Sequence, residues 1–168
     1  MAAAGHVRFY ARTCVSPATA SRDATALRRV RALLLGLVTI AMVVTAVDLL
    51  LLDHYEDVWQ FPPLVTIVLG FAVVAWAWFS GSANAVTAMR ISMVLFLATG
   101  AAGMLFHYNG NREFQREMDP SLGGWALFVK VMRAKAPPAL APAAMIQIGL
   151  LGLLYTYRLV TPAEDPGA

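Results

Sequence analysis

Four long apolar runs constrain the fold of this chain more than any other feature. They cover Ala32–Leu52, Leu64–Phe79, Met89–Phe106 and Ala139–Tyr157. At 1.5 Å of rise per residue, a helix of about 20 residues crosses the roughly 30 Å hydrocarbon core of a bilayer. Continuous apolar runs lack the alternation of barrel strands, and only helices or closed barrels satisfy their backbone groups in lipid. The sequence therefore predicts an all-α membrane protein with a four-transmembrane-helix bundle.

Composition agrees with a chain that folds in lipid. Hydrophobic residues make up 59% of the 168 and charged residues only 14%, against about 25% charged in soluble domains. Cys14 is the only cysteine, so a disulfide within the chain is excluded. We expect a disordered basic tail at 1–27, a transmembrane domain at 28–160 with helices at about 32–52, 61–79, 88–106 and 139–158, and a disordered tail at 161–168.

The distribution of charge predicts the orientation in the membrane. Arginines precede the first apolar run, whereas the first connection holds Asp53, Glu56 and Asp57 without any base. The positive-inside rule then places both termini in the cytoplasm, in a bacterial inner membrane. The basic third connection opposes this orientation. The Arg- and Ala-rich tail is also typical of an organelle presequence, which stays an alternative to a disordered bacterial tail.

One pattern occurs twice. An apolar run ends in His54-Tyr55 and the next one begins near Pro62-Pro63; later a run ends in His107-Tyr108 and the next begins near Pro137-Pro138. Two hairpins with these markers would bring both histidines to one side of the membrane. The repeat is either a true duplication or a coincidence of residues that suit helix ends.

The two histidines define a candidate site at the ends of the first and third helices. With Asp53 and Glu56 they form a ligand set suited to zinc, iron, copper or manganese. Alternatively, the two imidazoles would ligate a haem b iron from both faces. No HExxH or CxxCH motif supports either cofactor. Proton handling and simple interfacial capping of the helices are the other interpretations.

Asp48 is the one acid inside an apolar run. A carboxylate within the bilayer is costly and favours a polar partner. We expect the first helix to pack on the third so that Asp48 faces His107, Tyr108 or Thr99. The alternative is a shallow carboxylate that reaches headgroup water.

Small residues predict where helices approach closely, either within the chain or between two copies. These helix-packing candidates are Ala98, Thr99, Ala102 and Gly103 in the third run and Gly149 and Gly152 in the fourth.

The third connection contains a short apolar stripe at helical spacing. Its residues, at i, i+3, i+4 and i+7, are Trp125, Phe128, Val129 and Met132. This pattern predicts a short amphipathic helix that lies in the outer membrane interface.

Motifs for nucleotide binding and serine hydrolysis are absent from the sequence. We therefore expect a small accessory or assembly subunit without enzymatic activity, whose partners are the lipid bilayer, other membrane subunits or a second copy, and not nucleic acid. The alternative is a metal- or haem-binding redox protein that uses His54 and His107 on the extracytoplasmic side. A small proton-coupled transporter is a third reading.

Overall fold

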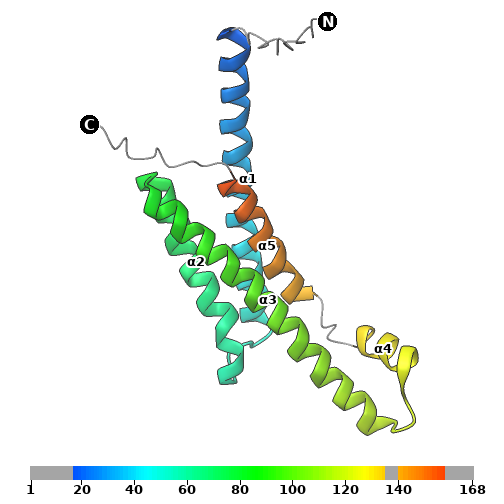
Figure 1. Cartoon of the computed structure of the whole chain (residues 1–168). Coiled ribbons are helices and arrows are strands. Elements are labelled where there is room, and N and C mark those ends of the chain that lie inside the picture. The colour runs from blue at the N-terminus through cyan, green and yellow to red at the C-terminus, as the bar shows by residue number, and fades with distance from the viewer. Residues whose placement is uncertain (1–16, 135–139, 158–168) are drawn as a thin grey trace, which may run out of the picture.

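The computed structural model describes residues 17–134 and 140–157, and this part of the chain contains no strand. Its elements are α1 (Pro17–Leu51), the 3-10 helix η1 (Val58–Gln60), α2 (Phe61–Ser80), α3 (Ala83–Met118), α4 (Gly124–Met132) and α5 (Leu140–Thr156), shown in Figure 1. The all-α prediction is confirmed for these residues.

Within the described residues, three segments are long and apolar enough to cross a membrane: Ser21–Leu51, Val58–Ser80 and Ala83–Met118. The chain is therefore a membrane protein by the length and composition of its helices. The fourth apolar run forms α5, a shorter helix of 17 residues.

Turn chemistry explains the boundary between α2 and α3. Gly81 closes α2 with φ at 57°, a left-handed conformation that favours glycine. Ser82 then caps α3, because its side chain accepts a hydrogen bond of 3.3 Å from the backbone N–H of Ala85. Pro62 and Pro63 fall in the first turn of α2, where proline is tolerated.

Two helices are longer than their apolar runs. α1 begins at Pro17, so the prediction of a disordered tail is wrong for residues 17–27; residues 1–16 and the C-terminal tail lie outside the described part. α3 continues past 106 to Met118, so His107 does not close it. Good helix formers dominate from Arg112 to Met118, and Pro120 after them favours an extended Asp119.

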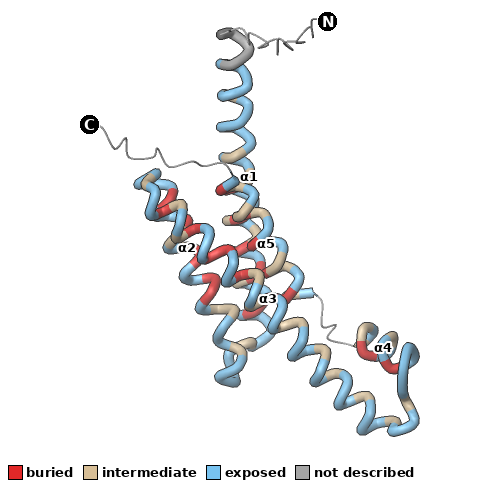
Figure 2. Tube along the Cα trace, viewed as in Figure 1, coloured by how far each residue is buried: buried red, intermediate tan, exposed pale blue. Residues whose placement is uncertain are grey.

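α3 and α5 form the most closely packed pair of helices, and α3 also packs on α2 while α5 packs on α1. In Figure 2 the buried residues gather where these helices meet. Met42, Met93, Phe96 and Ile148 are fully buried there. Among the described helices α4 packs mainly on α3, and in Figure 1 it lies apart from α1 and α2.

Glycines allow the close approach of α3 and α5. A Cβ atom built on Gly149 would lie 2.7 Å from the carbonyl oxygen of Met93, and one on Gly100 would lie 2.6 Å from the carbonyl oxygen of Pro142. At Gly152 the side chain of Met93 occupies the space that a Cβ atom would need. Backbone atoms cannot move aside as a side chain tip can, so both helices depend on these glycines.

Two arginines hold the C-terminal end of α5. Arg31 of α1 donates to the carbonyl oxygen of Tyr157 at 3.4 Å, and Arg90 of α3 donates to that of Thr156 at 3.0 Å. A helix end leaves its last carbonyl groups without partners and carries a partial negative charge. Both bonds satisfy that end. We call this side of the bundle the arginine end and the opposite side, with His54 and His107, the histidine end.

We expect Gly149→Ala to lower the thermal stability of the protein in detergent, because the new methyl group meets the backbone of α3. Overpacking of this kind costs about 1–3 kcal/mol. Gly110→Ala is the matched control: it lies in α3 with nothing within 4 Å of its Cβ position. It should stabilise the helix by about 0.5–1 kcal/mol. Equal melting temperatures of the two variants would contradict the glycine contact.

Candidate functional site

The C-terminus of α1 fixes the backbone of His54. The N–H of His54 donates to the carbonyl oxygen of Leu49 at 2.9 Å, and that of Asp53 donates to Leu50 at 3.2 Å. Asp53 has φ at 51°. These two bonds and a left-handed residue make a Schellman motif, here with aspartate where glycine is usual. The chain turns at Asp53, and His54 begins the connection that leads to α2.

The structure brings His54 next to His107 of α3. Their ring centroids are 6.0 Å apart and the ring planes are inclined by 29°. A second ring contact lies at the same end of the bundle, with centroids 6.2 Å apart between Trp59 of η1 and Phe106 of α3. Two successive residues of α3 thus contact the connection between α1 and α2.

The two predicted carboxylate ligands, Asp53 and Glu56, form other contacts than the histidine pair. Asp53 accepts a hydrogen bond of 2.8 Å from the hydroxyl of Tyr55. Glu56 is exposed, and its backbone N–H donates to the side chain of Gln60 at 2.9 Å. Within residues 17–134 and 140–157, no group of three or more histidine, cysteine or acidic side chains is arranged to hold a metal ion. The pair of imidazoles is what the structure brings together.

The environment of His54 disfavours its protonated form. Partial burial lowers the pKa of His54, and the positive charge on a protonated His107 lowers it further. A proton on His107 therefore opposes protonation of His54.

Asp48 does not face α3. It is exposed on α1, whose packing partners are α5 and α2, so the prediction that α1 packs on α3 through Asp48 is wrong. Two of the expected partners contact other residues. Thr99 shares a hydrogen bond of 3.2 Å with Thr66 of α2, and the ring centroid of Tyr108 lies 6.3 Å from that of Phe128. α5 holds the place against α1 that we expected α3 to take.

The predicted packing residues divide between two faces. Gly149 and Gly152 lie in the α3–α5 contact, and a Cβ on Gly103 would meet Pro142 at 3.4 Å. Ala98 and Ala102 are exposed. Gly100 was missed, although it belongs to the same small-residue segment of α3.

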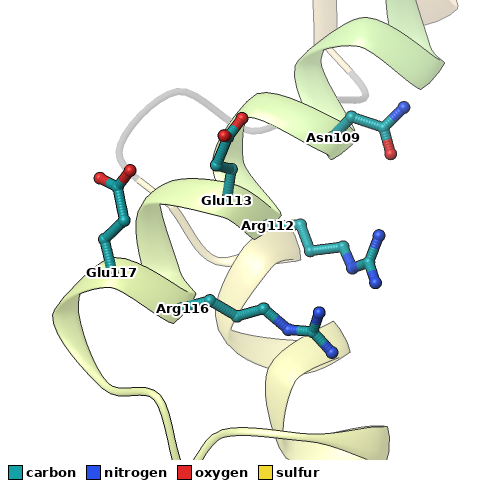
Figure 3. Close-up of a pocket in the computed structure, with 5 residues that line it drawn as sticks. All are labelled: Asn109, Arg112, Glu113, Arg116 and Glu117. Carbon is teal, nitrogen blue, oxygen red and sulfur yellow. The ribbon is translucent and has the colours of Figure 1, made fainter.

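The polar extension of α3 and α4 form a hairpin beyond the bundle (Figure 1). Figure 3 shows Arg112 and Arg116 on one side of α3 and Glu113 and Glu117 on another, around a shallow hollow that also includes Asn109. These five side chains come from one helix, and they are the solvated surface of that helix rather than a binding cavity.

α4 presents two kinds of apolar residue. Leu127 and Val131 are buried, in a helix that packs on α3. The predicted stripe is less covered: Trp125 and Phe128 are exposed, with ring centroids 5.1 Å apart, while Val129 and Met132 are half-buried. Within the described residues, Trp125 thus stays largely exposed and Phe128 partly so.

Comparison with known proteins adds no functional information. No protein-family model, curated protein or solved structure matches this chain. Its function must therefore be inferred from its own residues.

We expect the stability of the protein to fall as the pH drops below about 6.5, the ordinary pKa of histidine. In the unfolded chain His54 has this pKa, whereas in the folded protein its pKa is lower. Between the two values the unfolded state binds more protons, so acid favours unfolding. The loss ends below the folded pKa. NMR titration of His54 measures that pKa directly.

His107→Gln removes the neighbouring charge, so the pKa of His54 should rise toward its ordinary value without reaching it, because partial burial remains. His107→Lys keeps a cation and is the control, in which the pKa of His54 should stay low. An unchanged pKa in His107→Gln would show that the two rings do not interact.

Proposed function

We propose that this chain is a four-helix inner-membrane protein that acts as an accessory or assembly subunit for a membrane partner. α5 serves as the fourth span: its 17 residues reach about 25 Å, which is near the lower limit for crossing a bilayer. Its packing on α3 and the two arginines at its C-terminal end support a span, since both arginines then lie at the level of the headgroups.

The charges at the two ends support an orientation with the arginine end in the cytoplasm. Arg28, Arg29 and Arg31 precede the apolar part of α1, and Arg90 lies near the start of α3. The connection at the histidine end between α1 and α2 carries only acids. Under the positive-inside rule the His54–His107 pair would then face the extracytoplasmic side.

The observation that carries the proposal is the exposure of Asp48 in an apolar helix. Leu37, Val44 and Leu51 are also exposed, and at 100° per residue they lie on the same face of α1 as Asp48. An aspartate near the bilayer centre costs about 2.5–3.5 kcal/mol on insertion scales, and less near the interface. A partner helix with a hydrogen-bond donor at this depth would offset that cost. The face is therefore a contact surface for another membrane subunit.

In addition to the Asp48 face of α1, an exposed face of α3 supports contact with a partner. Ala98 and Ala102 are exposed and spaced i, i+4, a small-xxx-small pair that permits close helix approach in lipid. Within the chain, Gly100 and Gly103 provide the approach of α3 to α5. The two exposed alanines are left for an external helix.

A photo-crosslinking amino acid at Val44 should join the protein to a distinct partner in native membranes, because Val44 lies beside Asp48. Val43 is the matched control: its exposure is 48% against 52% for Val44, but it points about 100° further around the helix.

Asp48→Ala should weaken the Val44 adduct, since interhelical hydrogen bonds contribute about 0.6–1.7 kcal/mol. Equal adducts from both positions, or an adduct that survives Asp48→Ala unchanged, would refute the proposed face.

The proximity of His54 and His107 favours a second candidate function, the binding of a metal ion or haem. Two ligand bonds of about 2 Å place the nitrogens no more than about 4 Å apart. A centroid separation of 6.0 Å permits this arrangement, because each nitrogen lies on the rim of its ring. A redox centre held by both imidazoles would fit an electron-transfer subunit.

Metal analysis and an absorption spectrum of the purified protein test this second candidate. We expect a stoichiometric metal or a haem band that either His54→Ala or His107→Ala abolishes. Glu56→Gln should leave it unchanged, because Glu56 lies in the same connection but is exposed. Protein purified from metal- and haem-replete cells with neither signal would reject the candidate.

A further inference from the structure

α1 and α2 lie close together at the histidine end and diverge toward the arginine end. Near the middle of the bundle a Cβ on Gly70 of α2 would come within 3.1 Å of the terminal methyl of Met42 of α1. Further toward the arginine end the two helices are separated by a groove with a volume of about 520 Å³. Leu35, Gly36 and Thr39 line it from α1, and Phe71, Val74 and Trp78 line it from α2.

The surface of this groove is apolar and open. The hydroxyl of Thr39 is satisfied by the carbonyl oxygen of Leu35 at 2.8 Å, so the indole N–H of Trp78 is the one other polar side-chain group among the lining residues. No atom lies within 4 Å of a Cβ position on Gly36. The groove can therefore take an apolar ligand, and none of its lining side chains carries a charge.

Positive charge stands at the open end of the groove. Arg28 is one helical turn before Ala32, and Arg29 is two turns before Gly36; Ala32 and Gly36 both line the groove. Both arginines are exposed. The oxygen partner recorded for Arg28 is the neutral hydroxyl of Thr25, at 3.2 Å. Long side chains on a helix lean toward its N-terminus, so both guanidinium groups extend away from the apolar groove, toward the headgroup layer.

The length of the groove selects a lipid chain over a protein helix. From Ala32 to Ile40, the lining residues of α1 extend over about 12 Å at 1.5 Å per residue. One leaflet makes up about half of the roughly 30 Å hydrocarbon core. The groove therefore spans most of one leaflet. A partner helix would need a groove along the whole span, but Met42 and Gly70 close this one near the middle.

We propose that this groove binds one acyl chain of an anionic glycerophospholipid, with its phosphate held by Arg28 and Arg29. The geometry matches each part of that ligand: an apolar slot of one leaflet's depth, and above it two guanidinium groups suited to phosphate oxygens. A zwitterionic phospholipid offers the same chain but no net charge for the two arginines. The site is thus selective for headgroup charge, and it depends neither on Asp48 nor on the histidines.

Trp78 lies in the groove and reports on its occupant. The test uses the full-length chain with Trp78 as its only tryptophan, the other three replaced by phenylalanine, in phosphatidylcholine vesicles. A tenth of the lipid carries brominated chains, which quench tryptophan on contact, with either a phosphatidylglycerol or a phosphatidylcholine headgroup. We expect brominated phosphatidylglycerol to quench Trp78 more strongly than brominated phosphatidylcholine. Each arginine should raise the association of the anionic lipid, relative to that of the zwitterionic one, roughly fivefold.

Three controls isolate the site. A chain with Trp76 as its only tryptophan should show no headgroup preference, because Trp76 is exposed on α2 but does not line the groove. Arg28→Gln with Arg29→Gln should abolish the preference of Trp78, whereas Arg112→Gln with Arg116→Gln removes the same net charge and should leave it. Gly36→Leu, which fills the groove, should reduce quenching of Trp78 by both lipids.

Three results would overturn the proposal. Equal quenching of Trp78 by the two lipids would show that the groove does not select charge. A preference that persists without Arg28 and Arg29 would place the headgroup elsewhere. Quenching of Trp78 by neither lipid, with Trp76 quenched normally, would mean that a protein surface such as a second copy covers the groove.

Discussion

The contact of α3 with α5 supports the rest of the bundle, and it depends on hydrogen atoms in place of side chains at Gly100 and Gly149. In lipid the hydrophobic effect does not drive one helix against another, so close packing and polar contacts must do so. α5 is the shortest of the four long apolar helices and the one against which both α1 and α3 pack. The bonds from Arg31 and Arg90 then fix its C-terminal end from the same two helices.

Apolar runs predict the presence of apolar helices well but the ends of those helices poorly, because hydrophobicity does not mark where backbone hydrogen bonding ends. α1 and α3 continue beyond their apolar runs, and the Asp119-Pro120 step ends α3. The two histidines were predictable as neighbours from the order of runs and turns alone, and the structure places them together. The Schellman motif that positions His54 was not predictable, because Asp53 takes the place of the glycine that marks such a turn.

Which helix packs on which was the hardest feature to predict from the sequence. Periodicity assigns residues to a face of a helix, but it does not say which helix covers that face. Asp48 was assigned to α3 from its depth, whereas α5 and α2 are the neighbours of α1. Likewise Gly100 and Ala98 belong to one small-residue segment, yet one lies against α5 and the other is exposed.

The separate faces of α1 would let one helix serve the bundle, the proposed lipid and the proposed partner together. At 100° per residue, Val38 and Thr45 point into the core, Gly36 and Thr39 point into the groove, and Asp48 lies with Leu37 on a third face. The groove and the Asp48 face are turned from each other by well over 90°. They also differ in depth, since the groove belongs to the arginine end and Asp48 lies close to the histidine end. A lipid in the groove therefore leaves the Asp48 face open, and a partner helix on Asp48 leaves the arginines free to hold a headgroup.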